Sequence, residues 1–367
     1  MRRLLVAVAA AFSLAALAAV AQERVVNVYN WSDYIDPKVL EEFTRETGIK
    51  VRYDVFDSND VLETKVLAGK SGYDVIVPSQ TYLNRMIQAG VLLKLDPSKI
   101  PNLKHAWPEI TRRLATYDPG NAHAVNYMWG TTGIGYNVGM IKERLGTTPI
   151  DTWDMVFRPE NLAKFKNCGI HMLDAADEMI PAALKFLGID PDSKKTADIE
   201  KAGALLMQLR GNVKKFHSSE YINALAGGEI CLVVGWSGDI FQARNRAKEA
   251  AAKTGKPAVE IDYALPKEGA LMWFDSFAIP KDAEHVEEAH IFINFMMRPE
   301  IAARNTNFVA YASGNLEAQK FVDKEILNNR SIYPDQATFK LLYTVTPYAQ
   351  DVQRVVTRVW TRVKSGR

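Results

Sequence analysis

The sequence has few of the residues and motifs that metalloenzymes and nucleotide-hydrolysing enzymes use. Its 367 residues include only two cysteines and six histidines, and their spacing does not match a metal site. Neither G-x-x-x-x-G-K-[ST] nor H-E-x-x-H occurs, which argues against a P-loop ATPase and a zinc protease of that type. Lys and Arg (45) nearly balance Asp and Glu (43), so nucleic acid or an acidic membrane surface is not expected as the partner. We expect no metal and no cofactor.

Long apolar runs are confined to the N-terminus. Arg2 and Arg3 precede an apolar stretch, residues 4–19, that only Ser13 interrupts. A charged start, a short apolar middle and small residues at the end are typical of a secretory signal peptide, which we predict for residues 1–21. A retained membrane anchor is the alternative, although the run is short for a span.

Cys168 and Cys231 are the two cysteines of the exported chain. Export to an oxidising compartment favours a single disulfide between them. Two buried free thiols are the alternative.

Short apolar strands alternate with amphipathic helices through most of the chain. Up to about Thr132 this rhythm predicts strands such as 49–56, and a second rhythm begins at Trp153. Such alternation predicts an α/β fold in which helices cover largely parallel sheets.

Two extended stretches divide this pattern and predict crossings between two lobes. They are the glycine-rich run 128–137 and the stretch 261–280. The predicted lobes are 22–132 plus 262–312 for lobe 1, and 133–261 plus 313–367 for lobe 2.

Aromatic and acidic side chains follow one another at three places in this pattern. They are Trp31-Ser32-Asp33-Tyr34 after the first strand, Trp236-Ser237-Gly238-Asp239 after strand 229–236, and Trp273-Phe274-Asp275 in the second crossing. Ligands of α/β proteins bind at the carboxyl ends of strands. Because aromatic faces attract a cation and a carboxylate neutralises it, the clusters predict a site for a ligand with several positive charges. The alternative is that these aromatic side chains only pack against the core. Ser79, the last residue of strand 73–79, is expected to cap the next helix.

The same residues belong to longer segments that carry a family resemblance. The chain resembles the periplasmic polyamine-binding proteins of bacterial ABC importers, the putrescine and spermidine receptors, over nearly all of residues 22–367. The matching segments are VYNWSDYI (28–35), YDVIVPS (73–79), LDAADE (173–178), GWSGD (235–239), PKEGALMWFDSF (266–277), YAS (311–313) and WTRVKSG (360–366).

The resemblance implies a two-lobed periplasmic-binding-protein fold of type II, in which each lobe is a central sheet flanked by helices and crossover strands form the hinge. The implied partners are putrescine or another polyamine and the membrane subunits of an ABC permease, with the receptor a monomer in the periplasm. It also implies the pairing of Cys168 with Cys231. By motif match, the ligand site comprises a box for the methylenes (Trp31, Tyr34, Trp236, Trp273, Tyr311), two acids for one ammonium (Asp239, Asp275), three residues at the other end (Ser32, Ser79, Glu178), and Asp33 lining the pocket.

Two positions bear on the length of the ligand. Trp273 stands where putrescine-preferring receptors tend to carry phenylalanine and spermidine-preferring ones tryptophan. Asp33 is typical of putrescine-preferring receptors, because spermidine-preferring receptors carry glutamate at this position. We expect putrescine to be favoured over spermidine.

Two other functions compete with transport. A polyamine sensor that signals through a membrane partner would keep the same architecture. An exported enzyme is the second alternative, since residues 235–239 resemble a nucleophile elbow, but Asp239 stands where that motif needs glycine. Asp174, Asp177 and Glu178 could be acid/base carboxylates, although a solvated helix start or a ligand contact from Glu178 fits them better.

Overall fold

The structure is a computed structural model that describes residues 23–367, so the predicted signal peptide lies outside the described residues. Within these residues the strands form a single sheet in the order β2-β1-β3-β9-β4-β7-β5-β6. The strands are β1 (Val25–Trp31), β2 (Lys50–Phe56), β3 (Val75–Ile76), β4 (Ala124–Asn137), β5 (Ile170–Met172), β6 (Lys215–Phe216), β7 (Leu232–Trp236), β8 (Ile261–Ala264), β9 (Ala270–Ala278), β10 (Ala312–Ser313) and β11 (Leu342–Tyr343).

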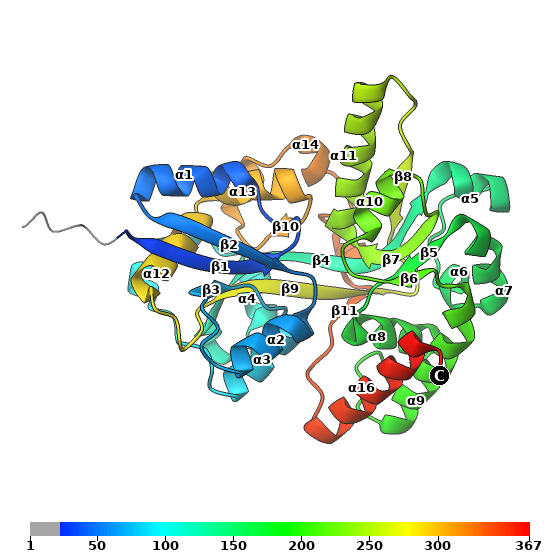
Figure 1. Cartoon of the computed structure of the whole chain (residues 1–367), viewed down its shortest axis with the longest axis horizontal. Helices are drawn as coiled ribbons and strands as arrows, with labels where there is room; N and C mark the ends of the chain where they lie inside the picture. Colours follow the sequence, from blue (N-terminus) through cyan, green and yellow to red (C-terminus); the bar gives the residue numbers. More distant parts are fainter. Residues whose placement is uncertain (1–22) are drawn as a thin grey trace, which may run out of the picture.

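Helices cover this sheet in two lobes that lie side by side (Figure 1). The first lobe carries α1 (Pro37–Thr47), α2 (Asn59–Leu67), α3 (Gln80–Gln88), α4 (Pro108–Leu114), α12 (Val286–Met296) and α13 (Pro299–Val309). The second lobe carries α5 (Val138–Leu145), α6 (Asp154–Phe157), α7 (Pro159–Leu162), α8 (Ala176–Phe186), α9 (Thr196–Leu209), α10 (Tyr221–Ala226), α11 (Ser237–Thr254) and α16 (Gln350–Ser365). Two short helices, α14 (Lys324–Leu327) and α15 (Gln336–Phe339), lie between α13 and α16 in the chain.

Local sequence signals set the bounds of the first elements. The Asp36 carboxylate accepts a hydrogen bond from the backbone N–H of Lys38, and Pro37 is the first residue of α1. Gly48, with φ 70°, ends the helix in the left-handed conformation. The chain then forms β2, which pairs in parallel with β1. The predicted strand–helix–strand rhythm is confirmed here.

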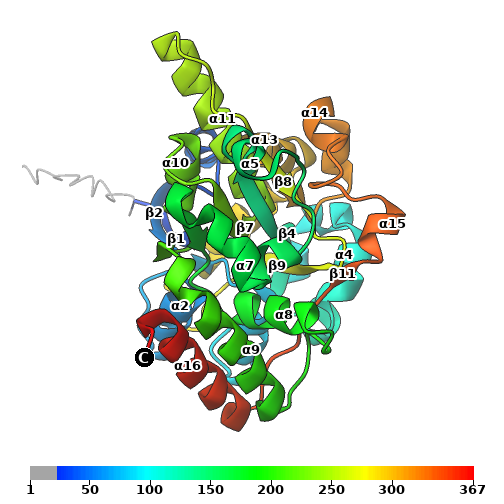
Figure 2. The same ribbon diagram turned by 90° about the vertical axis from the view of Figure 1, so that its right-hand side faces the viewer.

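The two lobes share the strands β4 and β9. The first half of β4 pairs antiparallel with β9, and its second half, from Thr132 on, pairs with β7 and β8. Every residue of both strands is buried. In each lobe the outer strands are parallel, β1 with β2 and β3, and β5 with β6 and β7. Figure 2 shows the C-terminal helix α16 lying along α9 of the second lobe.

Glycines make room for aromatic side chains where the lobes meet. A Cβ on Gly130 of β4 would lie 2.6 Å from the Trp273 ring. A Cβ on Gly238, at the start of α11, would overlap the ring of Tyr311. The two rings therefore pack directly against backbone, which restricts their motion.

Cys168 and Cys231 form a disulfide, with their Cα atoms 5.4 Å apart and a sequence separation of 63. This decides between the two alternatives left by the sequence and agrees with the family pattern. The bond joins the segment before β5 to the segment before β7, so it fastens two neighbouring strands of the second lobe.

Reduction of this disulfide should lower the stability of the protein. A closed loop of this length contributes about 4 kcal/mol in the chain-entropy model. Thermal unfolding with and without a reductant measures the effect, with the Cys168→Ser/Cys231→Ser double variant as the control that should not respond to reductant. A wild-type melting temperature unchanged by complete reduction would contradict a stabilising role.

Candidate functional site

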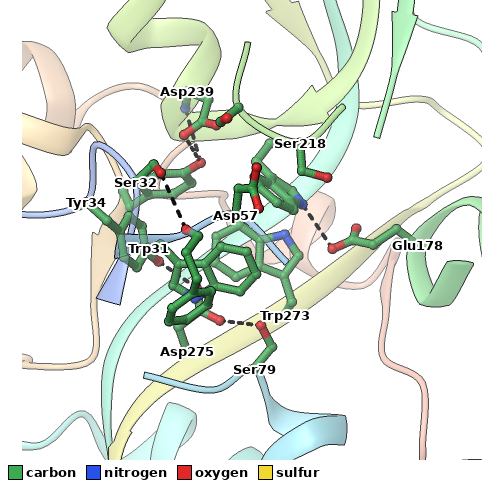
Figure 3. A pocket seen from close by; sticks show the side chains of 14 residues that line it. Trp31, Ser32, Tyr34, Asp57, Ser79, Glu178, Ser218, Asp239, Trp273 and Asp275 are labelled. Carbon is green, nitrogen blue, oxygen red and sulfur yellow. Dashed lines mark hydrogen bonds between the residues drawn. The ribbon is translucent and has the colours of Figure 1, made fainter. Parts of the chain in front are cut away.

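A cavity lies between the two lobes (Figure 3). Its walls come from Trp31, Ser32, Tyr34, Phe56, Asp57, Ser79, Glu178, Ser218, Ser219, Trp236, Asp239, Trp273, Asp275 and Tyr311. Ten of the eleven predicted ligand-binding residues are in this set.

Asp275 is the carboxylate that β9 places in the cavity. The Ser79 hydroxyl donates a hydrogen bond of 2.6 Å to its Oδ1, and the Tyr34 hydroxyl donates one of 2.8 Å to its Oδ2. Ser79 stands at the N-cap position of α3 but makes no capping hydrogen bond with its side chain. The expected capping role is therefore wrong, because the hydroxyl is bound to Asp275 instead.

Asp239 is the carboxylate of the second lobe, in the first turn of α11. The hydroxyls of Tyr311 and Tyr221 donate to its two oxygens over 2.6 and 2.7 Å. The same Tyr221 hydroxyl accepts the backbone N–H of Trp236 at 3.2 Å, and so ties the acid to the end of β7.

The protein gives these two acids hydrogen-bond donors but no counter-cation. Asp239 and Asp275 are only 5% and 4% exposed, and in the described chain neither forms a salt bridge. Burial raises the pKa of each carboxyl to about 7, although the donated hydrogen bonds oppose the shift. Such a site favours a ligand that brings positive charge.

Glu178, in the first turn of α8, forms another acidic point of the cavity. The Trp236 indole N–H donates to its Oε1 over 2.9 Å, and the Thr132 hydroxyl donates to its Oε2. Burial, with Asp177 beside it, raises the pKa of Glu178 to about 8.

Aromatic rings from both lobes line the space between these acids. The ring centroids of Trp31 and Trp236 lie 5.5 Å apart, those of Tyr34 and Tyr311 5.1 Å, and those of Trp273 and Tyr311 5.3 Å. Edge-to-face packing of this kind holds the rings in fixed orientations. Their faces suit an aliphatic chain or a cation.

Asp33 is the one predicted residue that does not line the cavity. It has a left-handed backbone with φ 56°, and its side chain is 39% exposed. Its carboxylate pairs with Arg246 of α11, whose other terminal nitrogen donates to Asn223 over 2.7 Å. The Asp33 side chain therefore joins the two lobes outside the cavity.

Sequence reasoning missed six residues that complete the site. Phe56 ends β2 and Asp57 follows it, so the rule that ligands bind at the carboxyl ends of strands could have found them. Ser218 and Ser219 have no comparable signal. The hydroxyls of Thr132 and Tyr221 donate hydrogen bonds to Glu178 and Asp239, which lie 46 and 18 residues away in sequence.

Within residues 23–367, no group of three or more His, Cys, Asp or Glu side chains is arranged to hold a metal ion. In the same residues, no helix has both the length and the apolar character needed to span a membrane.

Two lobes with shared strands, and a cavity lined by both, define a two-lobed binding protein. The model of the bacterial extracellular solute-binding protein family matches residues 38–330, and the chain belongs to this family. It is 50% identical over 364 residues to the putrescine-binding periplasmic protein SpuD of Pseudomonas aeruginosa, covering 99% of this chain and 98% of that one. It is 47% identical over 349 residues to the putrescine-binding periplasmic protein PotF of Escherichia coli, covering 95% of this chain and 93% of that one.

A solved structure is similar over the same extent. The spermidine/putrescine ABC transporter substrate-binding protein PotD of Streptococcus pneumoniae matches with a TM-score of 0.73 and 31% identity, covering 94% of this chain and 99% of that chain. These findings confirm the predicted family resemblance and the two-lobed type II fold.

The raised pKa values predict how stability depends on pH. For Asp275 the native pKa of about 7 lies above the ordinary value, so its contribution is full below about pH 4 and is lost as the pH rises through 7. Asn at this position does not ionise. The free energy of unfolding of ligand-free Asp275→Asn, relative to wild type, should therefore increase by about 2–3 kcal/mol between pH 5 and pH 8. Urea unfolding at a series of pH values measures this, and a difference independent of pH would contradict it.

Proposed function

We propose that the protein is a periplasmic receptor that captures a polyamine, putrescine in preference to spermidine, between its lobes and delivers it to an ABC permease. The observation that carries this proposal is the pair of buried acids, Asp239 and Asp275, without a counter-cation in an aromatic cavity. An ammonium group would neutralise them, and the rings would take the place of water around the methylenes. Relatives at 50% and 47% identity are named putrescine-binding periplasmic proteins, which supports the choice of ligand.

In this proposal all eleven residues predicted from sequence serve the ligand, ten of them as walls of its cavity. Asp239 and Asp275 hold one ammonium group, with Ser79 bound to Asp275 at that end, and Glu178 and Ser32 arrange the other end. Asp33 acts from outside, through its pairing with Arg246. The rings of the methylene box are Trp31, Tyr34, Trp236, Trp273 and Tyr311.

Closure of the two lobes on the ligand is part of the proposal. We assign residues 22–132 plus 262–312 to lobe 1 and 133–261 plus 313–367 to lobe 2, with β4 and β9 as hinge strands. Contacts from both lobes to one ligand exist only when the lobes are closed, so binding favours that state. The permease would then distinguish the loaded receptor from the empty one, and the receptor itself, acting as a monomer, would catalyse no reaction.

Titration calorimetry tests the ligand directly. The mature protein should bind putrescine with micromolar or higher affinity, and more tightly than cadaverine, spermidine or spermine. Chemical analysis of the putrescine after incubation should find it unchanged. Absence of heat with all four amines would contradict the proposal, and turnover of any of them would favour an enzyme.

The acid pair is tested by removing one charge at a time. Asp239→Asn and Asp275→Asn should each weaken putrescine binding by at least about tenfold, because loss of one partner of a buried charge pair costs about 2–5 kcal/mol. The matched control is Asp74→Asn, since Asp74 is equally buried at 1% exposure but is not a cavity residue. Calorimetry of the three variants measures the effect, and wild-type affinity in both cavity variants would place the ammonium elsewhere.

A further inference from the structure

The indole N–H of Trp273 is a buried donor without an acceptor. Trp273 is 5% exposed, and its Nε1 has no hydrogen-bond partner in the part of the chain that the structure describes. The two other tryptophans of the cavity differ from it. Trp31 donates to the backbone oxygen of Val77 over 3.0 Å, and Trp236 donates to Glu178. A buried N–H without a partner is costly, so this one calls for an explanation.

Packing prevents the Trp273 ring from turning away to find a partner. The ring lies against the backbone of Gly130 and against the ring of Tyr311, and the Trp236 ring is 6.3 Å away on another side. Figure 3 shows the Trp273 side chain within the cavity wall, in the region between Asp275 and Glu178. Because Trp273 lines the cavity, a bound molecule that reaches its Nε1 can supply the acceptor.

An ammonium group cannot satisfy this donor, because an ammonium only donates hydrogen bonds. The carboxyl oxygens of Glu178 are already engaged by Trp236 and Thr132. Burial raises the pKa of Glu178 to about 8 and those of Asp239 and Asp275 to about 7, so Glu178 carries less negative charge at neutral pH than either of the two aspartates. The hydroxyls of Ser218 and Ser219 offer acceptors as well as donors. A group that both donates and accepts hydrogen bonds matches this mixed set.

We propose that the cavity also takes a mono-N-acylated diamine, with its ammonium at Asp239 and Asp275 and its amide carbonyl accepting the Trp273 N–H. This inference rests on the proposed function, because it uses the same acid pair for the charged end. It adds a ligand class with one positive charge and one neutral amide. Trp273 becomes the residue that distinguishes this class from simple diamines, because only the amide can accept its N–H.

The substitution Trp273→Phe removes the indole N–H but keeps an aromatic ring, so it distinguishes the two contributions. Because the smaller ring can weaken the binding of both ligands, the measured quantity is the ratio of their affinities, and calorimetry should show N-acetylputrescine binding weakened about tenfold more than putrescine binding. Heptylamine is the matched ligand control, because it has the same chain length without the amide. It should bind the wild type more weakly than N-acetylputrescine does, and the substitution should weaken its binding no more than it weakens putrescine binding.

The outcomes separate this inference from the proposed function. No binding of putrescine by the wild type would contradict the function itself. Binding of putrescine without binding of N-acetylputrescine would overturn only the inference. So would an equal loss of affinity for both ligands in Trp273→Phe, because the N–H would then have no part in recognising the amide. Retained putrescine binding by the variant shows that it is folded.

Discussion

The structure depends on the burial of two carboxylates that, within residues 23–367, form no salt bridge. Asp239 lies at the start of α11 and Asp275 on the shared strand β9, and each is held by two hydroxyl groups. Hydroxyls orient a carboxylate and reduce the cost of its burial, but they do not supply the missing positive charge. The site therefore favours a ligand that brings positive charge. The shared strands place the two acids, and the aromatic walls enclose the space between them.

The fold brings the two acids together although 36 residues separate them in the chain. Asp275 lies on β9, one of the shared strands, and Asp239 begins the helix that follows β7, which pairs with β4. β4 lies between β7 and β9, and its Thr132 pairs with Trp236 on one side and Leu271 on the other, so the end of β7 is one strand away from the start of β9. Small residues at Gly130 and Gly238 then allow Trp273 and Tyr311 to close over the space between the acids.

The sequence was informative wherever a residue's role follows from its own segment. The cap at Asp36 and the stop at Gly48 are local, and they predicted α1. The aromatic and acidic residues after β1 and β7 could be placed at one site because strand ends meet at a sheet edge. Roles that depend on distant partners were not predictable from residue types. The hydrogen-bond partner of Ser79, Asp275, is 196 residues away. Nothing in the segment around Ser79 indicates that its hydroxyl binds this carboxylate instead of capping α3.

The crystal structure of the protein with putrescine tests the central claim most directly. The account predicts one ammonium nitrogen within about 3 Å of carboxylate oxygens of both Asp239 and Asp275, with the methylenes between the tryptophan and tyrosine rings. A diamine bound outside this cavity, or inside it with neither ammonium near the two acids, would contradict the account.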